Sequence, residues 1–134
     1  MSVSHADTMP RRLYRNAQSY PDSPAFAEKY LGIWQTYSWK ETGSEVRALA
    51  CGLASLWLQR GAMVALIGTN RPQLYWVFFA TQSLGAVPVP IYQDGVPAEL
   101  EFVLNHAGVR FAVVENQEQA DKLLEIKEKC PALE

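Results

Sequence analysis

The chain has 134 residues, the size of one domain, and this length is enough to bury roughly two-thirds of the surface that the unfolded chain exposes. Hydrophobic residues make up 49% and charged residues 19%, which excludes an intrinsically disordered segment. The formal net charge of -2 argues against a dedicated nucleic-acid binder. The basic residues Arg11, Arg12 and Arg15 have helical spacing and no interleaved aromatic residues, so we expect them on a solvated helix face.

No segment of the sequence has the features of a membrane span or a signal peptide. The longest apolar run, residues 74–80, is far shorter than the ~20 residues of a spanning helix. We therefore expect a cytoplasmic protein, and the sequence does not indicate peripheral membrane contact. Cys51 and Cys130 lie far apart without further Cys or His ligands nearby, which predicts two reduced thiols. The final Leu133-Glu134 is as compatible with a vector-encoded end as with natural sequence.

The first elements in chain order are a short helix and a hairpin. A helix is expected over 10–19, with Thr8 as its N-cap and a proline in its first turn, where the missing N–H costs nothing. Two aromatic-rich runs, 25–30 and 33–37, then predict a β-hairpin in which Gly32 supplies the positive φ of the turn.

A second helix is expected to begin after Ser38. Ser38 and Glu41 have the spacing of a capping box, in which each side chain accepts a hydrogen bond from a backbone N–H of the other residue. The apolar residues that follow recur every three or four positions and form one stripe: Val46, Leu49, Ala50, Leu53, Leu56 and Trp57.

The remaining chain alternates between strands and helices. Strands are expected at 63–67, 87–91 and 111–114, with starts 24 residues apart, and helices at 72–84 and 97–107 fill the intervals. The strands are almost continuously hydrophobic, which is typical of strands buried on both faces by crossover helices. The sequence therefore predicts a parallel sheet.

Polar and glycine residues mark the helix ends in this region. Asn70 and Asn116 are candidate N-caps, and Gly108 stands where a left-handed C-cap is needed. A last helix is expected over 118–129, before Pro131. The predicted fold class is α/β: an N-terminal helix and β-hairpin followed by a βαβαβα parallel-sheet unit.

Ligands of such sheets bind in the loops that follow the strands, because the carboxyl ends of the strands open into a crevice where strand order reverses. Here these loops are 68–70, 92–95 and 115–116. Neither G-x-G-x-x-G nor G-x-x-x-x-G-K-[ST] occurs, so the glycine loops that bind phosphates are absent from the sequence.

Several residues have side chains of the kinds that act in catalysis or metal binding, but a structural role explains each of them better. His106 lies late in a predicted helix, where the helix dipole favours a cation, and His5 belongs to an end expected to fray. Glu99 and Glu101 are two positions apart on a helix, so they do not face each other and are expected as surface charges.

The aromatic run of Trp76, Phe78 and Phe79, with Tyr75 beside it, allows two interpretations. It could line a pocket for an acyl chain, but packing against the sheet is favoured because large aromatic side chains are common in any core. The residues alone therefore predict no catalytic, cofactor-binding or metal-binding position in this chain.

Three segments resemble the N-terminal part of the adenylate-forming superfamily, which includes acyl-CoA synthetases, luciferases and peptide-synthetase adenylation domains. The segments are 36–41, 61–72 and 84–92, and their order and spacing carry the resemblance. Residues 90–92 and 113–124 are similar to the long-chain fatty-acid branch. One departure is Ala62, where the family usually has Asp in a loop entering a strand.

The resemblance implies that residues 1–134 are an incomplete N-terminal part of an AMP-binding domain, within the large N-terminal domain of the acyl-CoA synthetase-like fold. Within it, 1–37 would form the helix and hairpin and 38–134 the α/β unit. The implied partners are the rest of the same polypeptide, a fatty acid, ATP and CoA.

The implied reaction has two steps. A carboxylate attacks the α-phosphate of ATP to give acyl-adenylate and pyrophosphate, with Mg assisting, and the CoA thiol then displaces AMP. The catalytic groups of the family lie later than Glu134, so the resemblance implies no site residue here. We expect the chain alone neither to form acyl-adenylate nor to bind ATP tightly.

Two alternatives stay open. One is an adenylation domain for an aryl, amino or short-chain acid. The other is a complete, non-catalytic binding module of flavodoxin-like architecture, which predicts a closed monomer. An enzyme fragment instead predicts exposed apolar surface and self-association through an exposed sheet edge.

Overall fold

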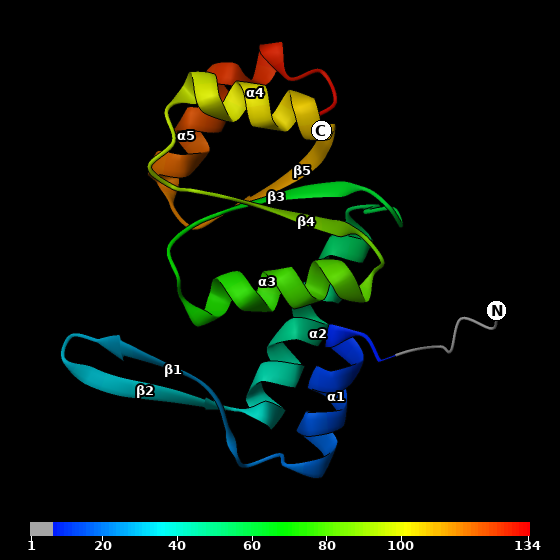
Figure 1. The fold of residues 1–134 in the computed structure, drawn as a ribbon, viewed down its shortest axis with the longest axis vertical. Coiled ribbons are helices and arrows are strands. Elements are labelled where there is room, and N and C mark those ends of the chain that lie inside the picture. Colours follow the sequence, from blue (N-terminus) through cyan, green and yellow to red (C-terminus); the bar gives the residue numbers. More distant parts are fainter. Residues whose placement is uncertain (1–6) are drawn as a thin grey trace.

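The computed structural model describes residues 7–134, so the expectation for His5 lies outside the described residues. A small parallel sheet has helices on both of its faces, and a two-stranded hairpin projects from one end of the molecule (Figure 1). The elements in chain order are α1 (Met9–Ser19), β1 (Pro24–Tyr30), β2 (Ile33–Ser38), α2 (Trp39–Ser55), β3 (Met63–Ile67), α3 (Pro72–Ser83), β4 (Val87–Ile91), α4 (Pro97–Ala107), β5 (Val109–Val114), α5 (Gln117–Ile126) and the 3-10 turn Lys127–Lys129. The predicted α/β class is confirmed.

The sheet has the strand order β4-β3-β5, and both pairs of neighbours are parallel. The central strand β3 is therefore the point where strand order reverses. Strands β3 and β4 have the predicted bounds, but β5 begins at Val109 rather than at residue 111. The difference arises because the register shifts between Met63 and Val64, so that an irregular first rung precedes the hydrophobic run.

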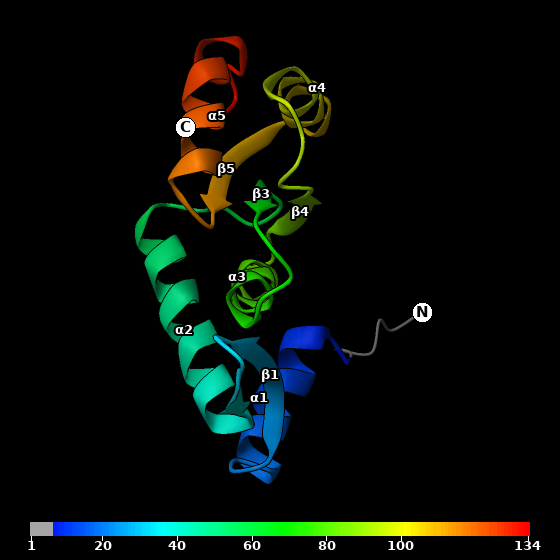
Figure 2. The same cartoon turned by 90° about the vertical axis from the view of Figure 1, so that its left-hand side faces the viewer.

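Two hydrophobic clusters lie on opposite faces of the sheet. Val64 and Leu66 of β3 pack on the side of α1, α2 and α3, whereas Ala65 and Ile67 pack on the side of α4 and α5. This alternation follows from the two-residue period of a strand. Figure 2 shows α3 lying between the sheet and the pair α1 and α2. Because α3 has neighbours on both sides, its buried residues are not confined to one face: Pro72, Trp76, Val77, Ala80 and Thr81.

Two predictions about the helices are wrong, and the other helix ends follow their sequence signals. Helix α2 ends at Ser55 and Trp57 has a positive φ of 64°, so Leu56 and Trp57, predicted on its buried stripe, lie beyond the helix and are exposed. Thr8, Ser38 and Asn116 accept hydrogen bonds as N-caps, and Gly108 has the left-handed φ of 62°. The prediction for Asn70 is wrong. Helix α3 starts at Pro72, so Arg71 occupies the cap position, while Asn70 accepts a hydrogen bond from the Tyr75 hydroxyl.

The hairpin turn needs two residues with positive φ. Leu31 and Gly32 lie between the paired residues Tyr30 and Ile33, with φ of 48° and 82°. Two positive φ values are typical of the type I′ turns that match the twist of a hairpin. The sequence predicted this role for Gly32 and missed it for Leu31.

The remaining sequence expectations concern the surface and the chain end. Arg11, Arg12 and Arg15 are exposed, as predicted, and both cysteines are free thiols. The last two residues belong to the fold, because Leu133 is 7% exposed and Glu134 pairs with Arg110. Within residues 7–134, no helix combines the length and apolarity that crossing a bilayer requires.

Candidate functional site at the carboxyl edge of the sheet

The loops that follow β3, β4 and β5 meet at one end of the sheet, as the parallel arrangement predicts. They line two cavities. A cavity of about 310 Å³ lies between the ends of β3 and β5 and the start of α3, with mainly apolar walls: Leu66, Ile67, Leu74, Val77, Val113 and Val114, with the polar residues Thr69, Arg71, Gln73 and Glu115 and the backbone of Gly68. A second cavity of about 580 Å³ lies on the β4 side, where Tyr92, Gln93 and Asp94 face Thr69 and Asn70.

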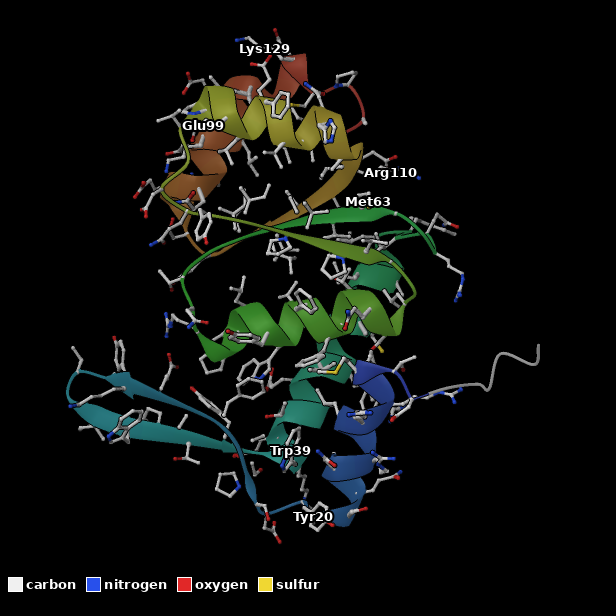
Figure 3. The ribbon with its side chains drawn as sticks, in the orientation of Figure 1. Tyr20, Trp39, Met63, Glu99, Arg110 and Lys129 are labelled. Atoms are coloured by element: carbon white, nitrogen blue, oxygen red, sulfur yellow. The ribbon has the colours of Figure 1, made fainter. Side chains whose placement is uncertain are left out.

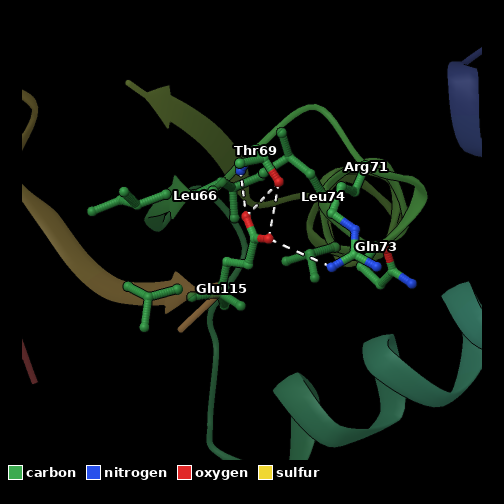
Figure 4. A pocket seen from close by; sticks show the side chains of 11 residues that line it. Leu66, Thr69, Arg71, Gln73, Leu74 and Glu115 are labelled. Carbon is green, nitrogen blue, oxygen red and sulfur yellow. Dashed lines mark hydrogen bonds and ion pairs between the residues drawn. The ribbon is translucent and has the colours of Figure 1, made fainter. Parts of the chain in front are cut away.

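Glu115 joins the ends of β3 and β5. Its carboxylate accepts hydrogen bonds from the backbone N–H of Thr69 and from the Thr69 hydroxyl, at 2.7 and 2.9 Å for the hydroxyl (Figure 4). The guanidinium of Arg71 lies 3.6 Å away. The bonds from Thr69, followed by the charge of Arg71, hold the pKa of Glu115 below its ordinary value.

Arg71 also links this edge to the hairpin. Its Nε donates to Glu28 of β1 at 3.0 Å, and the Tyr37 hydroxyl of β2 donates to the other oxygen of Glu28 at 3.1 Å. The bond from Arg71, aided by that from Tyr37, lowers the pKa of Glu28. Tyr37 packs edge-on against Trp76 of α3, with ring centroids 5.1 Å apart. One arginine therefore connects the hairpin, α3 and β5.

Gly68 lets the two strand ends come together. A Cβ at this position would lie 2.9 Å from Oε2 and 3.0 Å from Cβ of Glu115. Atoms of real side chains do not approach this closely, so any larger residue would displace the Glu115 carboxylate. Glycine is needed here for space.

The charged side chains at this edge are already paired with one another or with neighbouring polar groups. Its two carboxylates are held in the charged form and their oxygens are occupied by Thr69, Arg71 and Tyr37. Among residues 7–134, no group of three or more His, Cys, Asp or Glu side chains could hold a metal ion. The described residues therefore form no metal-binding cluster, and no chemical step is assigned to them.

The structure keeps the other sequence candidates away from this edge. His106 is exposed and stacks on Phe102, with ring centroids 5.6 Å apart. Glu99 accepts from the Val96 N–H, whereas Glu101 pairs with Lys129, so the two carboxylates do not cooperate.

The aromatic run on α3 packs into the core. Trp76 is 7% exposed, and Phe78 and Phe79 pack against the same hydrophobic cluster. None of these three rings lines either of the two cavities described above.

The sequence predicted which loops meet at this edge, but it did not predict which residues of these loops bond to one another. Thr69 and Glu115 are 46 positions apart, and Glu28 and Arg71 are 43 positions apart, so no local pattern joins them. A polar residue directly after a buried strand is the one signal that could have singled out Glu115, because it places a side chain at the strand-order reversal.

A protein-family model described as AMP-binding enzyme matches residues 13–134. The chain belongs to the AMP-binding enzyme family. Two relatives of this family member come from mycobacteria. Long-chain-fatty-acid–CoA ligase FadD15 of Mycobacterium bovis is 26% identical over 98% of this chain and 22% of its own length. Uncharacterized protein Rv1549 of Mycobacterium tuberculosis is 33% identical over 82% of this chain and 62% of its own length.

Solved structures share the fold of this AMP-binding family member. The N-terminal domain of FACL13 from Mycobacterium tuberculosis, with an inhibitor bound, has a TM-score of 0.85 and 21% identity, covering 96% of this chain and 32% of that one. The Klebsiella oxytoca NpsA N-terminal subdomain in complex with 3-hydroxybenzoyl-AMSN has a TM-score of 0.75 and 26% identity, covering 84% of this chain and 28% of that one. The chain thus spans about a fifth of FadD15 and about a third of the FACL13 domain.

Proposed function

We propose that this chain is the N-terminal portion of an ATP-dependent long-chain fatty-acid–CoA ligase, whose AMP-binding domain is completed by further polypeptide. The observation that carries the proposal is the match to FadD15 over 98% of the chain, together with membership of the AMP-binding family. The ligase would convert a fatty acid, ATP and CoA into the CoA thioester, AMP and pyrophosphate. We propose a cytoplasmic location for it.

In this proposal the chain supplies scaffold. The network of Glu115, Thr69 and Arg71 fixes the ends of β3 and β5 against α3, and Glu28 ties the hairpin to the same point. The groups that bind ATP, Mg and CoA would come from the rest of the protein, since the described residues offer no phosphate loop and no metal-binding cluster.

One other acid class has a specific observation in its favour. The NpsA subdomain carries an aryl ligand in its structure and is as similar to this chain in identity, at 26%, as FadD15 is. An aryl acid is therefore the second candidate substrate.

The test compares acids in Mg-dependent ATP–pyrophosphate exchange. The longest natural polypeptide that contains this chain is assayed with palmitate, 3-hydroxybenzoate and aspartate. The 134-residue chain alone is assayed in parallel. We expect exchange with palmitate in the longer protein and none in the chain alone. Exchange that depends only on the aryl or amino acid would overturn the fatty-acid assignment, whereas exchange by the 134-residue chain would overturn its role as scaffold.

A further inference from the structure

The outer face of α4 carries an aromatic ring that the rest of the described chain leaves uncovered. Phe102 is 69% exposed, although its side chain is large and apolar. The His106 ring, one turn later, stacks on it with centroids 5.6 Å apart and ring planes inclined by only 12°. In Figures 1 and 2, none of the elements formed by residues 7–134 lies beyond α4 on its outer side. The stacked rings of Phe102 and His106 are therefore open to solvent.

A carboxylate lies on the same face of α4 as the two rings. Glu99, Phe102 and His106 are spaced by three and four residues, which places them along one side of the helix. Figure 3 shows Glu99 near the start of α4. One oxygen of Glu99 accepts from the Val96 N–H, whereas its other oxygen and both nitrogens of His106 have no hydrogen-bond partner among residues 7–134. The face has an acid at one end, a base at the other and an aromatic ring between them.

Glu99 and His106 cannot satisfy each other within one chain. They are seven residues apart, which is about 10 Å along a helix axis. The neighbouring polar side chains are already paired: Glu101 with Lys129 at 3.5 Å, and Asn105 by donating to the Lys129 carbonyl at 3.0 Å. Glu99 and His106 are thus left for a partner from outside the described chain.

A second copy of the chain would satisfy all three side chains at once. At about 100° per residue, Glu99 and His106 lie about 60° and 40° around the helix from Phe102, on the same flank. If two α4 helices pack antiparallel about a two-fold axis at Phe102, the two Phe102 rings meet. Each His106 then lies opposite the Glu99 of the other copy, so the same charge pair forms twice. Parallel packing would not form these pairs.

We propose that the outer face of α4 is a self-association surface, on which a second copy of this chain docks antiparallel through Phe102, Glu99 and His106. A membrane surface fits this face less well, because the face carries a carboxylate and neither lysine nor arginine. One ring and two charge pairs predict a weak, transient dimer rather than an obligate one. The proposal does not depend on which acid the enzyme activates.

The first test removes the central ring. Sedimentation equilibrium is measured from about 10 μM to about 1 mM for the 134-residue chain and for the longest natural polypeptide that contains it. We expect both to form dimers as their concentration rises, and Phe102→Ser to weaken this association at least about tenfold. Glu45→Lys, at an exposed position on α2, is the control and should leave the association unchanged.

The second test reverses charges to examine the antiparallel pairing. His106→Glu sets two carboxylates against each other in its own dimer, and Glu99→Lys sets the new cation against the imidazole. In a mixture of the two variants, the new carboxylate meets the new lysine, and the remaining Glu99 meets the remaining His106. We expect each variant alone to associate at least about fivefold more weakly than the parent, and the mixture to return to within about twofold of it. Glu99 also caps α4, so circular dichroism checks that both variants keep the helical content of the parent.

Four results would contradict the proposal. The first is a parent that stays monomeric at about 1 mM, and the second is association that Phe102→Ser leaves intact, which would place the contact elsewhere, such as the β5 edge. The third is a mixture that associates no better than its separate variants. The fourth is dimerisation of the 134-residue chain but not of the longer polypeptide, because further polypeptide would then cover α4. None of these results affects the ATP–pyrophosphate exchange that tests ligase function.

Discussion

Glu115 holds the carboxyl edge together, and it does so only while it is charged. Because hydrogen bonds from Thr69 and the charge of Arg71 lower its pKa below 4.5 in the folded state, the unfolded chain takes up a proton more readily. The stabilisation by Glu115 is therefore complete above the ordinary pKa of 4.5 and is lost as the pH falls through the lower folded value.

We predict that Glu115→Gln makes the stability of the protein less sensitive to acid. Denaturant unfolding between about pH 7 and about pH 3 should show a smaller loss of stability in the variant than in the parent, because one linked proton is removed. Glu45→Gln, at an exposed position on α2, is the matched control and should follow the parent curve. Parallel curves for Glu115→Gln and the parent would show that this carboxylate carries none of the acid dependence.

Replacing Gly68 by alanine should destabilise the protein, whereas the same replacement at a control glycine should stabilise it. Gly68→Ala places a Cβ 2.9 Å from the Glu115 carboxylate, and we expect a loss of about 1–3 kcal/mol through the displaced contact with Thr69. Gly52 lies inside α2, and no other part of the protein packs within 4 Å of the place that a Cβ would take, so Gly52→Ala should stabilise by roughly 0.5–1 kcal/mol. Chemical denaturation measures the stability of both variants. A Gly68→Ala variant more stable than the parent would show that a Cβ at this position does not clash with Glu115.

At the scale of elements, the start of α2 depends on the Ser38 capping box. Ser38 Oγ accepts from the Glu41 N–H at 3.2 Å, and the Glu41 carboxylate accepts from the Ser38 N–H at 2.8 Å. Ser38→Ala should cost about 0.5–2 kcal/mol of unfolding free energy because a backbone donor loses its partner. The exposed Ser44, inside α2, provides the control, and Ser44→Ala should change stability by less than about 0.5 kcal/mol. Equal effects of the two changes would remove the capping box as an explanation.

Signals that act within a few residues were readable from the sequence. Ser38, Thr8 and Gly108 work through neighbours three or four positions away, so their roles could be predicted from spacing alone. The N-cap predicted at Asn70 was one residue too early, because α3 begins at Pro72 and the cap is the residue directly before it. The bounds of β3 and β4 were predictable because their hydrophobic runs are short and sharply ended.

The candidate site could be located only as a set of loops. Parallel topology predicts that the ends of β3, β4 and β5 converge, but the partners of Glu115 and Glu28 depend on contacts across more than forty positions. The order β4-β3-β5 is likewise set by which side of β3 each crossover helix packs against. Neither kind of information is contained in a local residue pattern.

At the scale of the whole molecule, the hairpin and the sheet are separate units joined through few polar contacts. The hairpin pairs only within itself, and Figure 1 shows it projecting from the body beside α2. Its polar link to the sheet is Arg71, which contacts Glu28 on one side and Glu115 on the other. The aromatic contacts of Tyr37 with Trp76 and of Phe26 with Tyr75 add an apolar link to α3.

We predict that Arg71→Ala loosens the hairpin without unfolding the sheet. The side chain of Glu28 is 13% exposed, so its charge would lose both its nearest cation and a hydrogen bond while remaining partly desolvated. Its pKa would rise, and amide exchange in β1 and β2 should become roughly fivefold faster while that of β3 stays near the parent rate. Arg47→Ala, at an exposed position on α2, is the control and should alter neither. Unchanged exchange in the hairpin of Arg71→Ala would mean that the aromatic contacts with α3 hold it in place, because they are the link that this substitution leaves intact.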